Sequence, residues 1–574
     1  MFESDRRTLP AHIPDSVARV DNETGTSRRR FLKHASLVLA EAQVGALLPL
    51  ASPPRAPDVG QANASPGRRP DLVVETLSGR VRGAVQDGIN VFKGIPYGAS
   101  TAGKNRFMPP KEPVPWSGVR DSTAFGHAAP QVPLGSNYDY ARIIDWLTFP
   151  GGQSEDCLVL NIWTPAVKDD GKRPVLVSFH GGGFTTGSGA NIFYNGLPLA
   201  KFGDVVVVTL NHRLGCLGHL SMADIGAPPE FAQAGVAGMM DCVLALEWVR
   251  DNIANFGGDS GKVMIFGQSG GGAKVSHLLA MPSARGLFQR AAIQSSGWPL
   301  RAMPRDCATR AAERMLAHLG LTKARVAELQ QVPVEMILSA QAALEAQEVP
   351  VDFAPVLDGS VIPRHPFDPD APPVSADVPL IISTTLDDVS FGRTDFDLDE
   401  AGLRNEVAKI ASGKADETVA AYRRAFPSSS AFLLLCKMLT DRGVRRTAYL
   451  LADRKAALHR APAYMYVLEF PSRAYGGKFG AVHATDVPLV FHNIAGQQLT
   501  GNGAEAKRVA DQMAAAWVAF ARTGNPNHAE IPHWPAYTPD TQETMIFNQT
   551  SRVENAPWNE LRSLWTASEP EPDC

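Results

Sequence analysis

Residues 263–275 read VMIFGQSGGGAKV. Four apolar residues predict a short buried strand, and a helix-compatible run from Ala273 to Ala280 follows the glycines. Between them lies the pattern G-x-S-x-G, in which a serine on a sharp strand-to-helix turn presents its hydroxyl beyond the sheet. Small residues two positions to either side let strand and helix pass closely, and the helix start directs N–H groups toward an oxyanion. We therefore predict that Ser269 is a catalytic nucleophile.

Two other interpretations of this pattern have to be weighed. A chain with 50 glycines in 574 residues can contain G-x-S-x-G by accident. The glycines could also belong to a dinucleotide-binding loop, but G-x-G-x-x-G needs glycine where Ser269 stands. The pattern occurs once in the chain, between a strand signal and a helix signal. This context favours a nucleophile elbow.

The composition excludes several other classes of protein. A hydrophobic content of 44%, a charged content of 20% and a net charge of −4 are typical of a soluble globular protein and argue against nucleic-acid binding. We expect no nucleic-acid partner and no stable membrane anchor in the mature chain. The six cysteines show neither a disulfide framework nor the spacing of a zinc site. We expect neither a metal nor another cofactor.

The N-terminus predicts an exported protein. Residues 27–33 read SRRRFLK, a twin-arginine signature followed by an apolar run at 35–50 and a small-residue cleavage site near 62–64. A chance basic cluster is the alternative, and Glu41 inside the apolar run favours it slightly. The expected organisation is an N-terminal extension of unknown role (1–26), an export signal with its cleavage region (27–64), a linker (65–70) and a single catalytic domain (71–574). Export would leave the protein periplasmic or secreted.

Beyond residue 71, the apolar pattern alternates between strands and helices. Three short strands (72–77, 81–85, 89–95) predict a small antiparallel edge, and an irregular aromatic section at 98–152 is typical of a lid or pocket wall. Buried strands of the main sheet are expected at 158–163, 175–179, 205–210, 263–266, 291–294, 380–383 and 463–468. Helices are expected at 235–255 and 505–522, the latter closing the chain, with helical blocks at 310–347 and 403–459. This order is typical of an α/β fold, an open and mostly parallel sheet with helices on both faces.

A second glycine-rich segment supplies candidate donors for an oxyanion. The expected strand at 175–179 runs into His180-Gly181-Gly182-Gly183. Consecutive glycines after a buried strand leave their N–H groups unshielded, whereas a plain tight turn rarely needs three of them. We assign the oxyanion hole to the N–H groups of Gly182, Gly183 and Gly270. His180 is interpreted as a structural residue that shapes this loop.

Together these segments resemble the type-B carboxylesterase family, which contains carboxylesterases, cholinesterases and bacterial para-nitrobenzyl esterases. The resemblance rests on the elbow, the His-Gly-Gly-Gly loop, SEDCLVLNIW at 154–163 and NHRLG at 211–215, in the order of the family. It extends from about residue 71 to about residue 547. It implies the α/β-hydrolase fold and a serine esterase, possessing a triad in the chain order serine, acid, histidine.

The resemblance also implies the two remaining members of the triad. The family carries its acid after the sixth strand, usually as the glutamate of an Asp-Glu pair; the matching segment here is STTLDDVSF (383–391), which puts Asp388 at the catalytic position and leaves Asp387 as the alternative. The base matches GAVHATDVP (480–488), so His483 falls on the family's histidine. Asp486 resembles an acidic residue that the family keeps just after its histidine, and is interpreted as a supporting residue.

Three departures from the family pattern limit the resemblance. The family's glutamate before the nucleophile is Gln268 here, which weakens the case for a quaternary-ammonium substrate. Gly270 replaces the commoner alanine, which predicts a looser elbow. The early disulfide partner of Cys157 is missing, because residues 128–131 read AAPQ, so we expect Cys157 to be free.

The leading hypothesis is a serine carboxylesterase that acts through an acyl-enzyme and a Ser-His-Asp triad. A lactonase, an amidase or a lipase on the same fold is the alternative, because specificity depends on pocket walls that the sequence does not define. A non-catalytic interaction homologue is a further alternative, although every triad position carries a residue that can perform its catalytic role. The expected partner is a small-molecule ester, and the expected state is a monomer or a homodimer.

Overall fold

The structure is a computed structural model that describes most of the chain. The described residues are 72–132, 139–146, 148–297, 300–347, 349 and 351–565. The predicted N-terminal extension (1–26), export signal with its cleavage region (27–64) and linker (65–70) lie outside the described residues and stay predictions. Within the described part, none of the helices is both long and apolar enough to cross a membrane.

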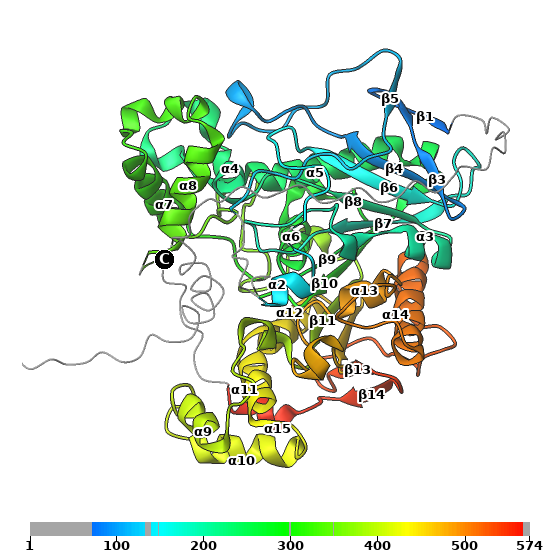
Figure 1. Ribbon diagram of the computed structural model, residues 1–574, viewed down its shortest axis with the longest axis vertical. Coiled ribbons are helices and arrows are strands. Elements are labelled where there is room, and N and C mark those ends of the chain that lie inside the picture. Colours follow the sequence, from blue (N-terminus) through cyan, green and yellow to red (C-terminus); the bar gives the residue numbers. More distant parts are fainter. Residues whose placement is uncertain are drawn as a thin grey trace, which may run out of the picture.

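An eleven-stranded sheet forms the centre of the molecule (Figure 1), in the order β14-β13-β12-β11-β10-β9-β7-β8-β6-β4-β3. The strands from β8 to β13 are parallel, whereas β6, β4 and β3 at one edge and β14 at the other run antiparallel to their neighbours. The strands are β3 Ala84–Gln86, β4 Ile89–Pro96, β6 Val159–Thr164, β7 Arg173–Phe179, β8 Val206–Leu210, β9 Gly258–Gln268, β10 Arg290–Gln294, β11 Leu380–Thr385, β12 Ala463–Leu468, β13 Glu543–Phe547 and β14 Arg552–Asn555. The prediction of a mostly parallel sheet is confirmed.

Helices cover both faces of this sheet, and the alternation of side chains along β7 shows why. Val175 and Val177 point to one face and pack in a core with α5, α6 and α12, whereas Leu176 points to the other face and packs with α3, α13 and α14. All of these side chains are fully buried, as both faces of a parallel sheet require. The helices are α3 Leu197–Gly203, α5 Ala237–Asn252, α6 Gly270–Ala280, α12 Arg446–Ala456, α13 Asp486–Val490 and α14 Ala504–Thr523. The expected two-sided cover is confirmed.

Two helical lobes stand on this framework, each with a core of its own (Figure 1). The first contains α7 and α8 beside the short helix α4, and the second contains α9, α10, α11 and α15. The helices are α4 Gly215–His219, α7 Arg305–His318, α8 Val334–Glu345, α9 Glu400–Ala408, α10 Ala415–Ala425, α11 Ala431–Thr440 and α15 Asn559–Ser563. The predicted blocks at 310–347 and 403–459 are therefore confirmed as helical, except that α12 in the second block packs on the sheet.

The structure corrects the prediction at both ends of the sheet. The helix α14 does not close the chain, because β13, β14 and α15 follow it. Each of these elements is short, and among the two strands only β13 is largely buried, so no clear apolar period marks this part of the sequence. The predicted antiparallel edge is divided: β1 (Val73–Thr76), β2 (Gly79–Arg82) and β5 (Val119–Asp121) form a separate sheet, while β3 and β4 join the main one.

The cysteines agree with the expected free thiol at Cys157. Cys157, Cys216, Cys242 and Cys436 are free and buried. Burial raises the pKa of each of these thiols, which keeps them protonated and unreactive. Cys307 takes part in a disulfide.

Candidate active site

The turn between β9 and α6 has the geometry of a nucleophile elbow. Ser269 adopts φ 59° and ψ −124°, a conformation that a residue with a side chain rarely takes. A Cβ on Gly267 would lie 2.4 Å from the backbone carbon of Gly271, so strand and helix pass too closely for larger residues at these positions. The N–H of Ser269 donates to the carbonyl of Gln294 on β10 at 2.8 Å. The side chain of Ser269 is half-buried. The elbow, residues 267–271, therefore holds a strained serine at the carboxyl edge of the sheet.

The structure brings Asp388 and His483 into direct contact. Asp388 follows β11, and His483 lies in the loop between β12 and α13. Oδ1 of Asp388 lies 2.6 Å from Nδ1 of His483, and Oδ2 accepts from the N–H and the hydroxyl of Thr385 at 3.0 Å each. Burial raises the pKa of the Asp388 carboxyl, but the imidazole and the Thr385 N–H outweigh it, so the pKa lies below its usual value. The ionised carboxylate fixes the proton on Nδ1 and leaves Nε2 as the basic nitrogen.

The neighbouring carboxylate, Asp387, points elsewhere. It forms a buried ion pair with Lys437 on α11, and its Oδ2 accepts from the N–H of Ala481 at 2.8 Å. A Cβ on Gly480 would collide with this carboxylate at 2.3 Å. Of the two candidates for the acid, only Asp388 contacts the imidazole.

Nε2 of His483 lies against the elbow through Gln268. The amide Nε2 of Gln268 lies 2.9 Å from Nε2 of His483 and donates to it, since the other imidazole nitrogen carries the proton. In the part of the chain that the structure describes, no hydrogen bond joins the hydroxyl of Ser269 to the imidazole. Hydrogen bonds of a catalytic base are often completed only when a substrate binds. The amide of Gln268 therefore competes with Ser269 for the same lone pair.

Two aromatic residues enclose the imidazole, and the sequence did not identify either as part of the site. Phe391 stacks on His483 with ring centroids 4.8 Å apart and 27° between the planes. Tyr140, on the short helix α2 (Asp139–Ile143), donates its hydroxyl to the carbonyl of His483. Tyr140 belongs to the irregular section at 98–152, so that section reaches the imidazole at this point. Phe391 lies three residues after Asp388 in the same helical turn, which is the signal that could have found it.

The glycine-rich loop lies directly beside the elbow. We call residues 180–183 the oxyanion loop. The N–H of Gly181 donates to the hydroxyl of Tyr194 at 2.9 Å, and the carbonyl of Gly182 accepts from the N–H of Thr186 at 3.0 Å. The N–H groups of Gly182, Gly183 and Gly270 have no acceptor among the residues that the structure describes. They are thus available to a ligand.

Gly270 has a packing role that the sequence did not indicate. A Cβ at this position would lie 2.1 Å from the carbonyl oxygen and 2.4 Å from the nitrogen of Gly183. Instead of loosening the elbow, the missing side chain makes room for the oxyanion loop. The two backbone segments that carry the predicted donors are therefore in van der Waals contact.

The predicted supporting residues are both buried. His180 binds the carbonyl of Gly181 through Nδ1 at 2.9 Å, and burial together with the nearby Lys274 lowers its pKa to about 3, which keeps it neutral. Asp486 accepts from the Tyr466 hydroxyl at 2.7 Å and from the Gln294 amide at 2.9 Å. Gln294 in turn binds the backbone of the nucleophile, so Asp486 supports the elbow and makes no direct contact with the imidazole.

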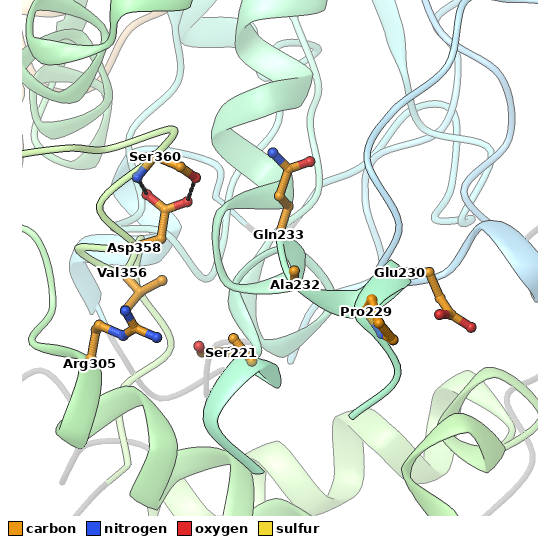
Figure 2. A pocket seen from close by; sticks show the side chains of 10 residues that line it. Ser221, Pro229, Glu230, Ala232, Gln233, Arg305, Val356, Asp358 and Ser360 are labelled. Atoms are coloured by element: carbon orange, nitrogen blue, oxygen red, sulfur yellow. Dashed lines mark hydrogen bonds between the residues drawn. The ribbon is translucent and has the colours of Figure 1, made fainter. Parts of the chain in front are cut away.

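A cavity of about 500 Å³ lies elsewhere, and none of the three predicted triad residues lines it. Figure 2 shows the N–H and hydroxyl of Ser360 directed at the carboxylate of Asp358, at 3.2 and 2.7 Å. Arg305 is paired at 2.6 Å with Asp224, which does not itself line the cavity. The lining residues are Ser221, Ala223, Pro229, Glu230, Ala232, Gln233, Arg305, Val356, Asp358 and Ser360. Among the described residues, no group of three His, Cys, Asp or Glu side chains is arranged to hold a metal ion.

Comparison with known proteins decides the family. A model of the carboxylesterase family matches residues 70–565, most of the chain. The chain belongs to the carboxylesterase family. It is a carboxylic ester hydrolase with the α/β-hydrolase fold, as the resemblance implied.

This carboxylesterase is similar to bacterial and animal esterases and hydrolases. It is 34% identical to the para-nitrobenzyl esterase of Bacillus subtilis, over 85% of this chain and 97% of that protein. It is 31% identical to the phenmedipham hydrolase of Pseudarthrobacter oxydans, over 83% of this chain and 94% of that protein. The crystal structure of the carboxylesterase of Geobacillus stearothermophilus shares 37% identity and a TM-score of 0.74, covering 86% of this chain and all of that one.

Proposed function

We propose that the protein hydrolyses small carboxylic esters through an acyl-enzyme formed on Ser269. The hydroxyl of Ser269 attacks the ester carbonyl carbon while Nε2 of His483 takes its proton. His483 then gives that proton to the departing alcohol, leaving an acyl-serine. A water molecule, deprotonated by the same nitrogen, attacks the acyl-serine; His483 then returns the proton to the Ser269 oxygen as the carboxylic acid leaves.

The other residues have supporting roles in this proposal. Asp388 orients the imidazole and stabilises the imidazolium that forms in each step. The N–H groups of Gly182, Gly183 and Gly270 stabilise the tetrahedral oxyanion, and each donor is worth about 3 kcal/mol in comparable enzymes. Gln268 has to release Nε2 before Ser269 can give up its proton. No metal or other cofactor takes part.

The observation that carries the proposal is the 2.6 Å contact between Asp388 and His483, with the free imidazole nitrogen held against the elbow by Gln268. An oriented base next to a strained serine and unpaired N–H groups is what acyl transfer needs. A non-catalytic homologue would have no need for this combination.

The direct test is Ser269→Ala in an assay with short-chain para-nitrophenyl esters. We expect kcat to fall by about 10⁴-fold or more. A fluorophosphonate probe should label the wild type and not the variant. Ser221→Ala, which changes a serine of the cavity in Figure 2, is the matched control and should keep full activity. Wild-type activity in Ser269→Ala would remove this serine from the mechanism.

The choice among ester, lactone and amide substrates needs an activity profile. We expect the purified mature protein, a monomer or a homodimer, to turn over small carboxylic esters faster than lactones, amides or long-chain glycerides. A clear preference for lactones, amides or long-chain glycerides would instead favour a lactonase, an amidase or a lipase.

The leader supports a further proposal, that the protein is exported by the twin-arginine route. Replacing Arg28 and Arg29 by lysine should keep the esterase in the cytoplasm of a bacterial host, whereas the unchanged leader should deliver activity to the periplasm or the medium. Equal export of both forms would contradict the proposal.

A further inference from the structure

Lys274 is buried in the helix that begins at the elbow. It lies five residues after Ser269 on α6, and its exposed fraction is 0%. Burying an ammonium group is costly unless other groups replace its hydration. Within the described residues, no carboxylate pairs with it. Its Nζ instead donates to the carbonyl of His180 at 3.0 Å and to the carbonyl of Gly183 at 2.7 Å.

These two carbonyls stand at the two ends of the oxyanion loop. Between them, the N–H of Gly181 is held by Tyr194 and the carbonyl of Gly182 by Thr186. In a trans peptide the C=O and the N–H point in opposite directions. The carbonyl of Gly182 shares its peptide with the N–H of Gly183, so the hydrogen bond from Thr186 turns that N–H to the opposite side. The two carbonyls that Lys274 binds share their peptides with the N–H groups of Gly181 and Phe184, so Lys274 fixes the two ends of the segment that carries the donors of Gly182 and Gly183. The ammonium of Lys274 is the group that holds both ends.

The other titratable groups that face Lys274 are uncharged. They come from several of the elements packed around it, and burial is the main cause of each change in pKa. Burial lowers the pKa of all four imidazoles, to about 3 for His180 and His219 and to about 4 for His277, and raises the pKa of the thiol. The groups are His180 at the end of β7, His212 after β8, His219 on α4, Cys242 on α5 and His277 on α6. The ring of Phe184 lies 5.5 Å from Nζ.

We propose that Lys274 is a positioning residue of the ester hydrolysis: it fixes the oxyanion loop through two carbonyls and adds a positive charge behind the N–H donors. The inference rests on the proposed function, because it needs an oxyanion to form at Ser269. A charge in a dry, low-dielectric setting acts more strongly than one in water, and it needs no reorganisation during the reaction. Lys274 does not touch the substrate.

The alternative is that Lys274 has only a structural role, in which it cross-links backbone carbonyls. The chain contains a second buried lysine with which it can be compared. Lys455 on α12 is also buried, and its Nζ donates to the carbonyls of Ser375 and Ala376 at 3.0 and 2.9 Å. Those carbonyls precede the amino end of β11, whereas the elbow lies at the carboxyl end of the parallel strand β9, at the opposite edge of the sheet. Lys455 therefore shows what a buried lysine does when it serves structure alone.

The first experiment compares Lys274→Met with Lys455→Met on a para-nitrophenyl ester. For Lys274→Met we expect kcat to fall about tenfold or more, less than the ~10²–10³-fold that follows loss of an oxyanion donor itself, with KM nearly unchanged. A trifluoromethyl ketone, which forms an oxyanion on the serine, should lose affinity by the same factor as kcat/KM. Lys455→Met should keep the wild-type kcat and inhibitor affinity, whatever its melting temperature.

The second experiment is the pH profile of kcat/KM. Burial lowers the pKa of Lys274 to about 7. Its charge is present below that pH and is lost above it, so the wild type should show a descending limb near pH 7 that ends in a lower plateau. Neither Lys274→Met nor Lys274→Gln should show this limb. The glutamine keeps one hydrogen bond to the loop, so its kcat should lie between those of wild type and Lys274→Met.

The outcomes separate this inference from the function on which it rests. Wild-type kcat and inhibitor affinity in folded Lys274→Met, or in Lys274→Gln should the methionine variant not fold, would overturn the inference while Ser269→Ala stays inactive. A wild-type profile without the descending limb would overturn the role of the charge. Wild-type activity in Ser269→Ala would overturn the proposed function itself.

Discussion

The elbow and the acid loop, residues 386–391, meet at His483 but are held in place in different ways. Around the elbow the contacts are between backbone atoms, with glycines at the points of closest approach and a single buried ammonium against the carbonyls of the oxyanion loop. Around the acid loop the contacts are buried ion pairs. Asp387 is paired with Lys437, and Arg445 binds Asp441 and the carbonyl of Leu386.

The elbow therefore depends on the steric fit of its backbone, whereas the acid loop depends on how its buried charges are paired. The elbow fixes positions of atoms that need no charge until the reaction begins, so steric contacts are sufficient. The acid loop has to keep one carboxylate ionised in a buried place, and the charges around it are paired so that Asp388 is free to serve the imidazole. Substitutions in the elbow should therefore act mainly through steric overlap. Substitutions in the acid loop should act mainly through a carboxylate or an ammonium that has lost its partner.

The sharpest test of this comparison uses the two neighbouring aspartates. Asp388→Asn should reduce kcat about 10⁴-fold, because an amide no longer selects the imidazole tautomer that leaves Nε2 free. Asp387→Asn should keep a kcat near that of the wild type and lower the melting temperature instead, because Lys437 loses its counter-charge. Single-turnover kinetics and thermal unfolding measure the two effects. The reverse result would make Asp387 the acid.

The partner of Asp387 gives the second prediction. Lys437→Met leaves an uncompensated buried carboxylate, which typically costs about 3–5 kcal/mol in the free energy of unfolding. Urea denaturation measures this loss. Lys409→Met is the control, because Lys409 pairs with Glu406 at the surface and such pairs contribute about 0–1 kcal/mol. Equal effects of the two changes would show that the buried pair adds nothing to the acid loop.

The third prediction breaks the elbow by size alone. A Cβ on Gly271 would lie 2.1 Å from the carbonyl oxygen of Phe179, so Gly271→Ala must push β7 and α6 apart. We expect a loss of about 1–3 kcal/mol in stability, typical of overpacking, together with lower activity. Gly443→Ala is the matched control, because no atom lies within 4 Å of a Cβ there. An elbow that accepts Gly271→Ala without loss would not depend on steric contacts.

The same contrast explains which parts of the site could be predicted from the sequence. The strand, the turn and the helix of the elbow lie within residues 263–280, so the glycine spacing that closes the turn is readable there. The family resemblance supplied Asp388 and His483. The contact of Gln268 with His483 spans 215 positions, and that of Asp387 with Lys437 spans 50. No local pattern marks such pairs, because they form only when distant strands become neighbours in the sheet.

The order of the strands in the sheet was likewise not predictable from local sequence patterns. Buried strands such as β8 and β12 are continuous apolar runs, and their existence followed from composition alone. Their order in the sheet did not, since β9 lies next to β7 although β8 separates them in sequence. The late strand β13 escaped prediction because it is stabilised by pairing with β12 rather than by a pattern of its own.

The smallest expected effect tests the charge of Asp388 without any substrate. Its pKa in the folded protein lies below the unfolded value of about 3.9, so the folded state binds fewer protons and loses stability as the pH falls below that value. This contribution is fully present above pH 4 and disappears as the pH falls through the folded pKa. The melting temperatures of wild type and Asp388→Asn should therefore differ most near pH 6 and converge as the pH falls through the folded pKa. A difference that stays constant over this range would mean that the carboxylate is not held in its charged form by the imidazole and Thr385.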